Sequence, residues 1–321
     1  MEFENVPHLL IFAPNWLGDA VMALPAIADL RRALPKTTID VFARRSIAPL
    51  FGLVRGVDGV LTGDVPRDRN YAAALLLTNS FQTALAARRA GIAERWGYRA
   101  DWRSWLLTRA VLPPPDTVHQ AASYQYLTRS LGFPSGPVEP ILCASDAAKS
   151  AGCELLASAG WDRATPLVAL APGAAYGGAK RWPEASFAEL ALSLARDGVR
   201  PVLIGGASDV VQEKFPGADP INLIGRTDLE TLAGVLIQCR ALVSNDSGAM
   251  HFAAGLGVHV VAVFGPTDER VTRPVARQGK SAVILTHEVW CRPCLHRECP
   301  LTHACMRGVG PGAVLDEVRR L

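Results

Sequence analysis

Two short turns, far apart in the sequence, carry the residue types of an anion-binding or catalytic site: residues 15–19 (NWLGD) and 245–251 (NDSGAMH). Each follows an apolar run and precedes a stretch whose apolar residues recur at helical spacing. A helix start offers unpaired backbone N–H groups and the positive end of the helix dipole, which favour bound anions. We therefore expect two ligand sites, in two nucleotide-type domains that face each other across a cleft.

Asp19 follows Gly18 at the expected first turn of a helix, and Pro14 makes the approach to this turn rigid. Because aspartate is also a favoured N-cap residue, a purely structural role is the alternative. Open α/β folds bind ligands at the carboxyl ends of their strands, where this side chain would lie. A carboxylate at that position could act as a general base.

The Gly-rich segment 171–183 ends in Lys180 and Arg181, just before a predicted helix. Glycines allow a close approach of the backbone, and the two cations could offset the charge that builds on a departing diphosphate. A flexible surface loop with solvated charges is the alternative.

The second turn could supply further phosphate contacts. Backbone N–H groups near Ser247 and Gly248 could bind a phosphate at the start of the next helix. Asp246 could hold a ribose hydroxyl or orient the loop, while His251 could touch phosphate or serve packing. A simple Asx-turn with a helix cap is the alternative.

Several cofactor motifs are absent from the sequence. No G-x-G-x-x-G follows the first predicted strand and no G-x-x-x-x-G-K-[ST] occurs, which argues against dehydrogenases and ATPases. No Asp-x-Asp pair is present to hold a divalent cation on a diphosphate. The charge of the leaving group would then be met by Lys180, Arg181 and helix N-termini.

Arginine and tryptophan alternate between residues 88 and 109, a stretch that includes Arg99 and Arg103. Arginine forks bind phosphate and carboxylate, and aromatic faces suit sugar rings, so this stretch could form an acceptor-binding face. A solvated helix pair whose tryptophans serve the core is the alternative. Nucleic-acid binding is less favoured, because the formal net charge of the chain is only +3.

Four of the seven cysteines lie within fifteen residues of one another, at Cys291, Cys294, Cys299 and Cys305. Structural zinc sites usually separate two cysteine pairs by about a dozen residues or more, and this spacing matches no ferredoxin pattern. A reduced or disulfide-prone loop is therefore favoured over a metal site.

Apolar runs alternate with helical patterns along the chain, which is typical of βαβ units and of the α/β class. Segments rich in breakers, followed by a predicted helix at 145–159, place a domain boundary near residues 140–165. We assign the domains to residues 1–155 and 156–321, with the last helix as a candidate to pack back on the first domain. Strands are expected at 8–13, 38–43, 72–77, 167–171, 201–206, 241–244 and 258–265.

The start of the chain and the lengths of its apolar runs indicate where the protein is located. The start of the chain is acidic at positions 2 and 4, unlike a secretory signal, and no run of about 18 apolar residues occurs. We expect a cytoplasmic protein, or one that lies peripherally on the inner face of the cytoplasmic membrane.

Taken together, these motifs resemble the ADP-heptose:lipopolysaccharide heptosyltransferases of glycosyltransferase family 9, and most of all the heptosyltransferase II group. The cysteine pattern also resembles that group. The resemblance covers nearly the whole chain in the expected order and is carried by residues 14–26, 78–92, 97–108, 172–183, 245–257 and 264–268.

The resemblance implies a GT-B fold of two Rossmann-like domains, with the acceptor on the first domain, the ADP-sugar on the second, no cofactor and no required metal. It implies Asp19 as general base and Lys180 as the donor-phosphate lysine. Ala174 and Ala175 replace polar residues of some relatives, so contacts there would come from the backbone. The implied donor-binding residues are Lys180, Arg181, Asp246, Ser247, Gly248 and His251, and the implied acceptor region contains Asn79, Arg99 and Arg103.

The predicted function is an inverting, metal-independent transfer of heptose from ADP-heptose to the lipid-anchored, anionic inner core of lipopolysaccharide, with addition of the second heptose favoured. We expect a peripheral contact with the inner membrane. We expect no nucleic-acid partner. The alternatives are a sugar-nucleotide epimerase or hydrolase on the same scaffold, and a cysteine-rich nucleic-acid-binding protein.

Overall fold

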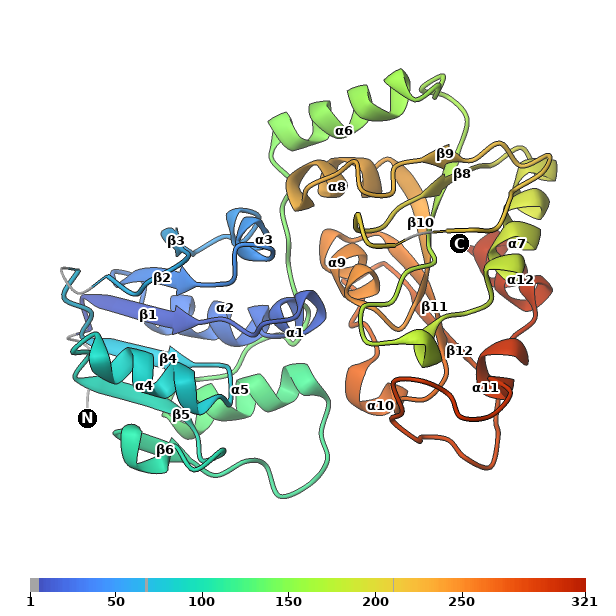
Figure 1. Ribbon diagram of the computed structural model, residues 1–321. Coiled ribbons are helices and arrows are strands. Elements are labelled where there is room, and N and C mark those ends of the chain that lie inside the picture. Colours follow the sequence, from blue (N-terminus) through green and yellow to red (C-terminus); the bar gives the residue numbers. More distant parts are fainter. Residues whose placement is uncertain (1–5, 67–68, 210) are drawn as a thin grey trace. The chain divides into compact units, whose positions relative to one another are not determined.

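The computed structural model describes residues 6–66, 69–209 and 211–321, which form two compact units, Met1–Cys143 and Ala144–Leu321 (Figure 1). The acidic positions 2 and 4 lie outside the described residues. The expected boundary between residues 155 and 156 falls inside helix α6 (Asp146–Ser158), which packs against α8 (Leu229–Leu236) of the C-terminal unit. The whole of α6 therefore belongs to that unit. Within the described ranges, no helix has the length and apolar character needed to cross a membrane.

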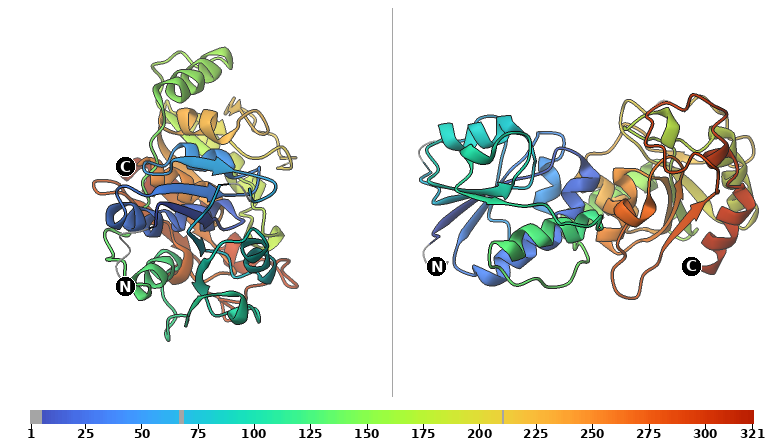
Figure 2. Two further views of the ribbon diagram at one scale, coloured as in Figure 1. Left: turned by 90° about the vertical axis from the view of Figure 1, so that its left-hand side faces the viewer. Right: turned by 90° about the horizontal axis from the view of Figure 1, so that it is seen from below.

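The N-terminal unit contains a six-stranded parallel sheet in the order β3-β2-β1-β4-β5-β6. Its central strands are short apolar runs that are buried on both faces, as parallel sheets require. Helix α4 lies on one face and helices α2 and α5 on the other (Figure 2). The strands are β1 (His8–Phe12), β2 (Thr38–Phe42), β3 (Gly59–Leu61), β4 (Ala73–Leu76), β5 (Glu94–Tyr98) and β6 (Arg109–Val111); the helices are α1 (Leu17–Met22), α2 (Leu24–Ala33), α3 (Ala48–Gly52), α4 (Phe81–Arg89), the 3₁₀ helix η2 (Ser104–Leu106) and α5 (Gln120–Ser130).

The stretch rich in arginine and tryptophan does not form a pair of helices, which was the alternative to an acceptor-binding face. It spans β5, η2 and β6, and Trp96 of β5 is buried against the core. These strands were missed because β5 carries charged residues at its start and β6 is only three residues long, so neither contains a continuous apolar run.

The C-terminal unit contains a second six-stranded parallel sheet, in the order β9-β8-β7-β10-β11-β12. Helices α7 and α12 share one hydrophobic core with the strands, and α8 and α9 contact β10. The strands are β7 (Leu167–Ala171), β8 (Arg200–Leu203), β9 (Ile221–Asn222), β10 (Cys239–Asn245), β11 (His259–Phe264) and β12 (Ala282–Thr286); the further helices are the 3₁₀ helix η3 (Gly178–Lys180), α7 (Glu184–Arg196), α9 (Gly248–Leu256), α10 (Glu269–Thr272), α11 (Ala304–Arg307) and α12 (Pro311–Arg320).

The last helix, α12, packs against α7 of the C-terminal unit. Val314, Leu315 and Val318 of α12 are buried in the core cluster that also contains Leu190 and Leu194 of α7. These apolar residues recur at helical spacing along one side of α12, and α7 covers that side.

The two sheets have the same strand order, counted along the chain within each unit. In this order the connections run in opposite directions from two adjacent central strands, which leaves a crevice at their carboxyl ends. The switch point lies between β1 and β4 in the N-terminal unit and between β7 and β10 in the C-terminal unit. The two turns singled out by the sequence directly follow β1 and β10.

Candidate functional site

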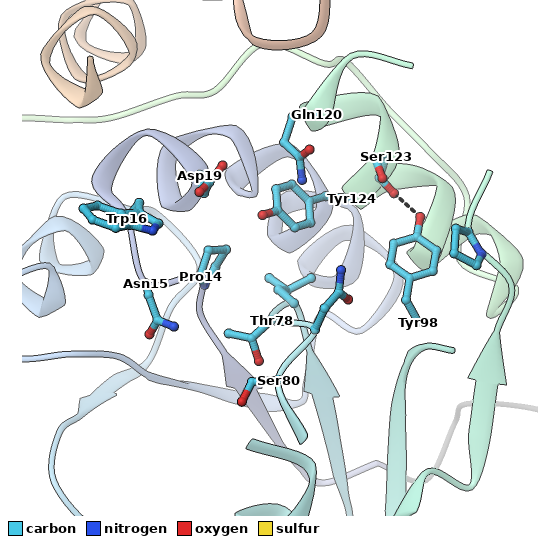
Figure 3. Close-up of a pocket in the computed structure, with 13 residues that line it drawn as sticks. Pro14, Asn15, Trp16, Asp19, Thr78, Ser80, Tyr98, Gln120, Ser123 and Tyr124 are labelled. Atoms are coloured by element: carbon cyan, nitrogen blue, oxygen red, sulfur yellow. Dashed lines mark hydrogen bonds between the residues drawn. The ribbon is translucent and has the colours of Figure 1, made fainter. Parts of the chain in front are cut away.

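A pocket of about 340 Å³ opens at the switch point of the N-terminal unit (Figure 3). The chain that leaves β1 lines one side, and the chain that leaves β4 lines another. The lining consists of Pro14, Asn15, Trp16, Asp19, Leu77, Thr78, Asn79, Ser80, Tyr98, Pro113, Gln120, Ser123 and Tyr124.

Asp19 reaches this pocket from the first turn of α1. Trp16 occupies the N-cap position and no side chain caps α1, so Asp19 is not the N-cap residue of the structural alternative. Burial and, after it, the charge of Asp19 raise the pKa of the Tyr124 phenol. The phenol therefore stays protonated and can donate a hydrogen bond to a ligand, while the Asp19 carboxylate can accept a proton.

Arg103 is fully buried and binds the segment 78–80, which forms one wall of the pocket. Its guanidinium donates to the carbonyl oxygens of Thr78, Ser80 and Tyr98, and to Asn79 Oδ1 at 3.3 Å. Burial lowers the pKa of Arg103 to about 10. Arg103 therefore supports the wall from inside and is not among the residues that line the pocket, and its assignment as an acceptor contact stays a prediction.

The other two residues of the predicted acceptor region are exposed. Asn79 lines the pocket, and Arg99 follows β5, where its backbone N–H donates to the Val111 carbonyl at 2.6 Å. The hydroxyl of Thr78 is buried and has no hydrogen-bond partner among the described residues. Since buried polar groups are normally paired, this hydroxyl is suited to a polar group of a ligand in the pocket.

Lys180 and Asp246 meet at the switch point of the C-terminal unit. The ammonium group lies 2.6 Å from Asp246 Oδ2, and the two side chains are 12% and 5% exposed. The Thr267 hydroxyl also donates to Asp246 at 2.6 Å, and Lys180 lies 4.7 Å from the centre of the Tyr176 ring. Asp246 is thus committed to Lys180 and Thr267, which favours the predicted loop-orienting role over the ribose-binding one.

Asn245 joins the two loops that form this site, a role that the sequence pattern did not assign to it. Its Nδ2 donates to the Pro172 carbonyl at 2.7 Å, and its Oδ1 accepts from the Trp182 backbone N–H at 2.9 Å. The amide is fully buried, so it holds the Gly-rich loop and the turn after β10 in one arrangement.

The turn after β10 ends at the start of α9, where Ser247 is the N-cap residue. No side chain caps α9, and the Ser247 hydroxyl lies 3.1 Å from that of Ser244. This start, which begins at Gly248, is suited to an anion. His251 is buried within α9, whereas Arg181 is exposed on the Gly-rich loop.

The segment 289–303, which we call the cysteine loop, binds the Gly-rich loop through hydrogen bonds. The backbone N–H of Ala179 donates to the Arg297 carbonyl at 2.9 Å, and that of Gly178 donates to Glu298 Oε1 at 2.9 Å. A Cβ atom at Gly177 would lie 2.3 Å from the Arg297 carbonyl oxygen, so a glycine is needed at this position. Nothing in the sequence pattern signalled this pairing of two distant loops.

All four clustered cysteines line one cavity of about 120 Å³, together with Ala179. Their thiols are free, and burial raises the pKa of Cys305, with smaller contributions from the other three. Across the described ranges, no group of three or more His, Cys, Asp and Glu side chains is arranged to hold a metal ion. The four thiols thus lie around one cavity beside the loop that carries Lys180.

Comparisons with known proteins point to one family. Residues 67–305 match the model of glycosyltransferase family 9 (heptosyltransferase). Lipopolysaccharide heptosyltransferase 2 of Salmonella typhimurium is 30% identical to this chain, and the match covers 87% of this chain and 88% of the relative. Lipooligosaccharide heptosyltransferase 2 of Haemophilus ducreyi is 32% identical, and the match covers 84% of this chain and 86% of the relative. The structure of E. coli ADP-heptose lps heptosyltransferase II superimposes with a TM-score of 0.83 at 28% identity and 98% coverage of both chains.

Proposed function

This chain belongs to glycosyltransferase family 9, the heptosyltransferase family, and from that premise we propose that it transfers heptose from ADP-heptose to the inner core of lipopolysaccharide. Addition of the second heptose is favoured because the relatives that match over most of the chain are heptosyltransferases 2. Membership of this family supports the transferase hypothesis over the epimerase, hydrolase and nucleic-acid-binding alternatives.

The single observation that carries the proposal is the placement of complementary chemistry at the two switch points. One holds a carboxylate in a pocket with polar walls, and the other holds a lysine next to the start of a helix. The first suits a sugar hydroxyl that must lose a proton, and the second suits a diphosphate that must leave with negative charge.

On the donor side, Lys180 and the start of α9 bind the diphosphate of ADP-heptose. Asp246 holds the ammonium group in place before the donor arrives, so little reorganisation is needed when phosphate oxygens approach. As the bond between the anomeric carbon and the phosphate oxygen breaks, the electron pair moves onto ADP, where the ammonium group and the helix start stabilise it.

On the acceptor side, Asp19 takes the proton from an acceptor hydroxyl. The resulting oxygen attacks the anomeric carbon from the face opposite to ADP, through an oxocarbenium-like transition state, and the configuration inverts. One carboxylate suffices, because the leaving group departs as an anion and needs no proton. Lys180 and the helix start carry the charge, so the reaction needs no metal ion.

The lipid anchor of the acceptor requires the protein to work at the inner face of the cytoplasmic membrane. We place it there as a peripheral protein, with lipopolysaccharide and ADP-heptose as partners and no nucleic acid.

A mass-spectrometric assay tests the proposal. The protein is incubated with ADP-heptose and with either heptose-free or mono-heptosylated lipopolysaccharide core, before and after treatment with a chelator. We expect one heptose to be added to the mono-heptosylated core at a rate that the chelator leaves unchanged. Donor consumption without any acceptor would instead indicate an epimerase or hydrolase, and transfer to the heptose-free core alone would reassign the enzyme to the first heptose.

A further inference from the structure

Three large apolar side chains are unusually exposed near the edge of the N-terminal sheet formed by β5 and β6. Trp102 is 93% exposed, Trp105 is 64% exposed and Leu112 is 63% exposed. We call these three residues the Trp102 patch. Large exposed apolar groups that lie close together commonly mark an interaction surface.

The local backbone and side-chain contacts hold this patch outward. Asp101 and Trp102 both have left-handed φ angles, of 49° and 55°, and Asp101 accepts a hydrogen bond from the Phe81 backbone N–H at 3.0 Å. Trp105 packs against the Phe81 ring at a centroid distance of 6.1 Å. The Arg88 guanidinium lies 5.2 Å from the centre of the Trp105 ring. The turn is therefore tied to α4, and the indole of Trp102 is presented to solvent.

The surroundings of the patch are strongly basic. Residues 81–112 contain six arginines and two acidic residues, a larger positive excess than the +3 of the whole chain. Arg88, Arg89 and Arg99 are exposed. Indole rings combined with arginines are the side chains that anchor proteins at the headgroup level of anionic membranes, because the rings enter the interface and the cations meet lipid phosphates.

The patch is also continuous with the rim of the pocket that contains Asp19. Leu112 is followed by Pro113, which lines the pocket, and Ser80 of the pocket wall is followed by Phe81, which contacts Trp105. A membrane that covers the patch would therefore lie beside the entrance to the pocket.

We propose that the Trp102 patch docks the N-terminal unit on an anionic phospholipid membrane, so that the saccharide of a lipid-anchored acceptor enters the adjacent pocket. This inference rests on the proposed function, because it takes the acceptor to be membrane-anchored. Trp102, Trp105 and Leu112 supply the apolar contact, and Arg88 and Arg89 supply the attraction to lipid phosphates.

Vesicle co-sedimentation of the full-length protein tests the docking surface. We expect binding to vesicles of phosphatidylcholine with phosphatidylglycerol, and weaker binding to phosphatidylcholine alone. The double variant Trp102→Ser/Trp105→Ser and the double variant Arg88→Gln/Arg89→Gln should each bind the anionic vesicles about tenfold less tightly or worse. The matched control is Ile141→Ser, which removes a 50%-exposed apolar side chain of the same unit outside the patch and should bind like the wild type.

Kinetics with two forms of the acceptor separate this inference from the proposed function. With a de-acylated, soluble acceptor the patch variants should keep the wild-type kcat and KM, and with the acceptor embedded in anionic vesicles their KM should rise. No transfer to either acceptor by the wild type would remove the proposed function. Transfer that is normal, together with unchanged vesicle binding by the patch variants, would overturn the docking surface. The docking surface would also be overturned if analytical ultracentrifugation showed a dimeric wild type and monomeric patch variants that bind vesicles normally.

Discussion

The ammonium group of Lys180 lies 2.6 Å from the carboxylate of Asp246, although the two residues follow different strands, β7 and β10. Both side chains are largely buried, and Thr267 donates a second hydrogen bond to the same carboxylate. The pair holds a cation at the switch point of the C-terminal sheet.

For Lys180→Ala we expect weaker binding of ADP-heptose and slower transfer, because the variant loses the charge that stabilises the leaving group. Asp246 would also be left buried without its cation, which should lower the free energy of unfolding by about 1–3 kcal/mol. Calorimetric titration with ADP-heptose and urea denaturation measure the two effects. Lys214→Ala, which removes an exposed lysine of the same unit, is the control, and unchanged donor affinity in Lys180→Ala would count against the assignment.

For Asp19→Ala we expect kcat to fall by about 10²–10⁴ with donor affinity nearly intact, because only the proton transfer from the acceptor is lost. Single-turnover kinetics and calorimetry with ADP-heptose measure these quantities. Asp116→Ala, at an exposed position of the same unit, should keep wild-type turnover. Comparable turnover by Asp19→Ala would remove Asp19 from the mechanism.

Arg103 and Arg99 should behave differently, although both belong to the predicted acceptor region. Arg103→Lys cannot satisfy the carbonyl oxygens of the pocket wall, so we expect it to lower the free energy of unfolding by about 1–3 kcal/mol and to raise the acceptor KM. Arg99→Lys changes an exposed side chain and should alter stability by less than about 0.5 kcal/mol. Urea denaturation of both variants checks this, and equal stability losses would contradict the placement of Arg103 as an internal support.

Glu298→Gln tests whether the cysteine loop positions the donor loop. The Glu298 carboxylate accepts from the Gly178 backbone N–H, two residues before Lys180, and a neutral amide accepts less strongly. We expect a several-fold rise in the KM for ADP-heptose with little change in the acceptor KM. Glu189→Gln, on the exposed side of α7, is the control, and steady-state kinetics in which both variants match the wild type would show that the loop contact does not matter for donor binding.

Tyr71 should make the stability of the protein depend on alkaline pH. Burial, followed by its hydrogen bond to Asp40, raises the pKa of Tyr71 to about 12, whereas an unfolded chain releases this proton near pH 10. Its contribution to stability is therefore present below pH 10 and is lost as the pH rises towards 12. Chemical denaturation of wild type and Tyr71→Phe should show a difference that shrinks above pH 10, and a constant difference would refute the linkage.

Much of the fold could be predicted from the sequence, because the central strands are apolar runs buried on both faces. The strands at β1, β4, β7, β10 and β11 were expected on this ground. The predicted helix over 145–159 and the helix predicted to follow residue 183 correspond to α6 and α7. The strands β3, β5, β6 and β9 were not expected, since they are short or carry charged residues and show no continuous apolar pattern. The edge strand β12 was not expected either, although it is an apolar run.

The sequence by itself determined the α/β class, the two turns that follow central strands, and the residue types available at each, because these depend on local periodicity and on helix starts. Only the tertiary structure decided how distant side chains are paired: that Asp246 holds Lys180, that Arg103 is buried behind the pocket wall, and that the cysteine loop binds the Gly-rich loop. Such pairings follow from the order of the strands in each sheet, which brings together segments that no local pattern connects.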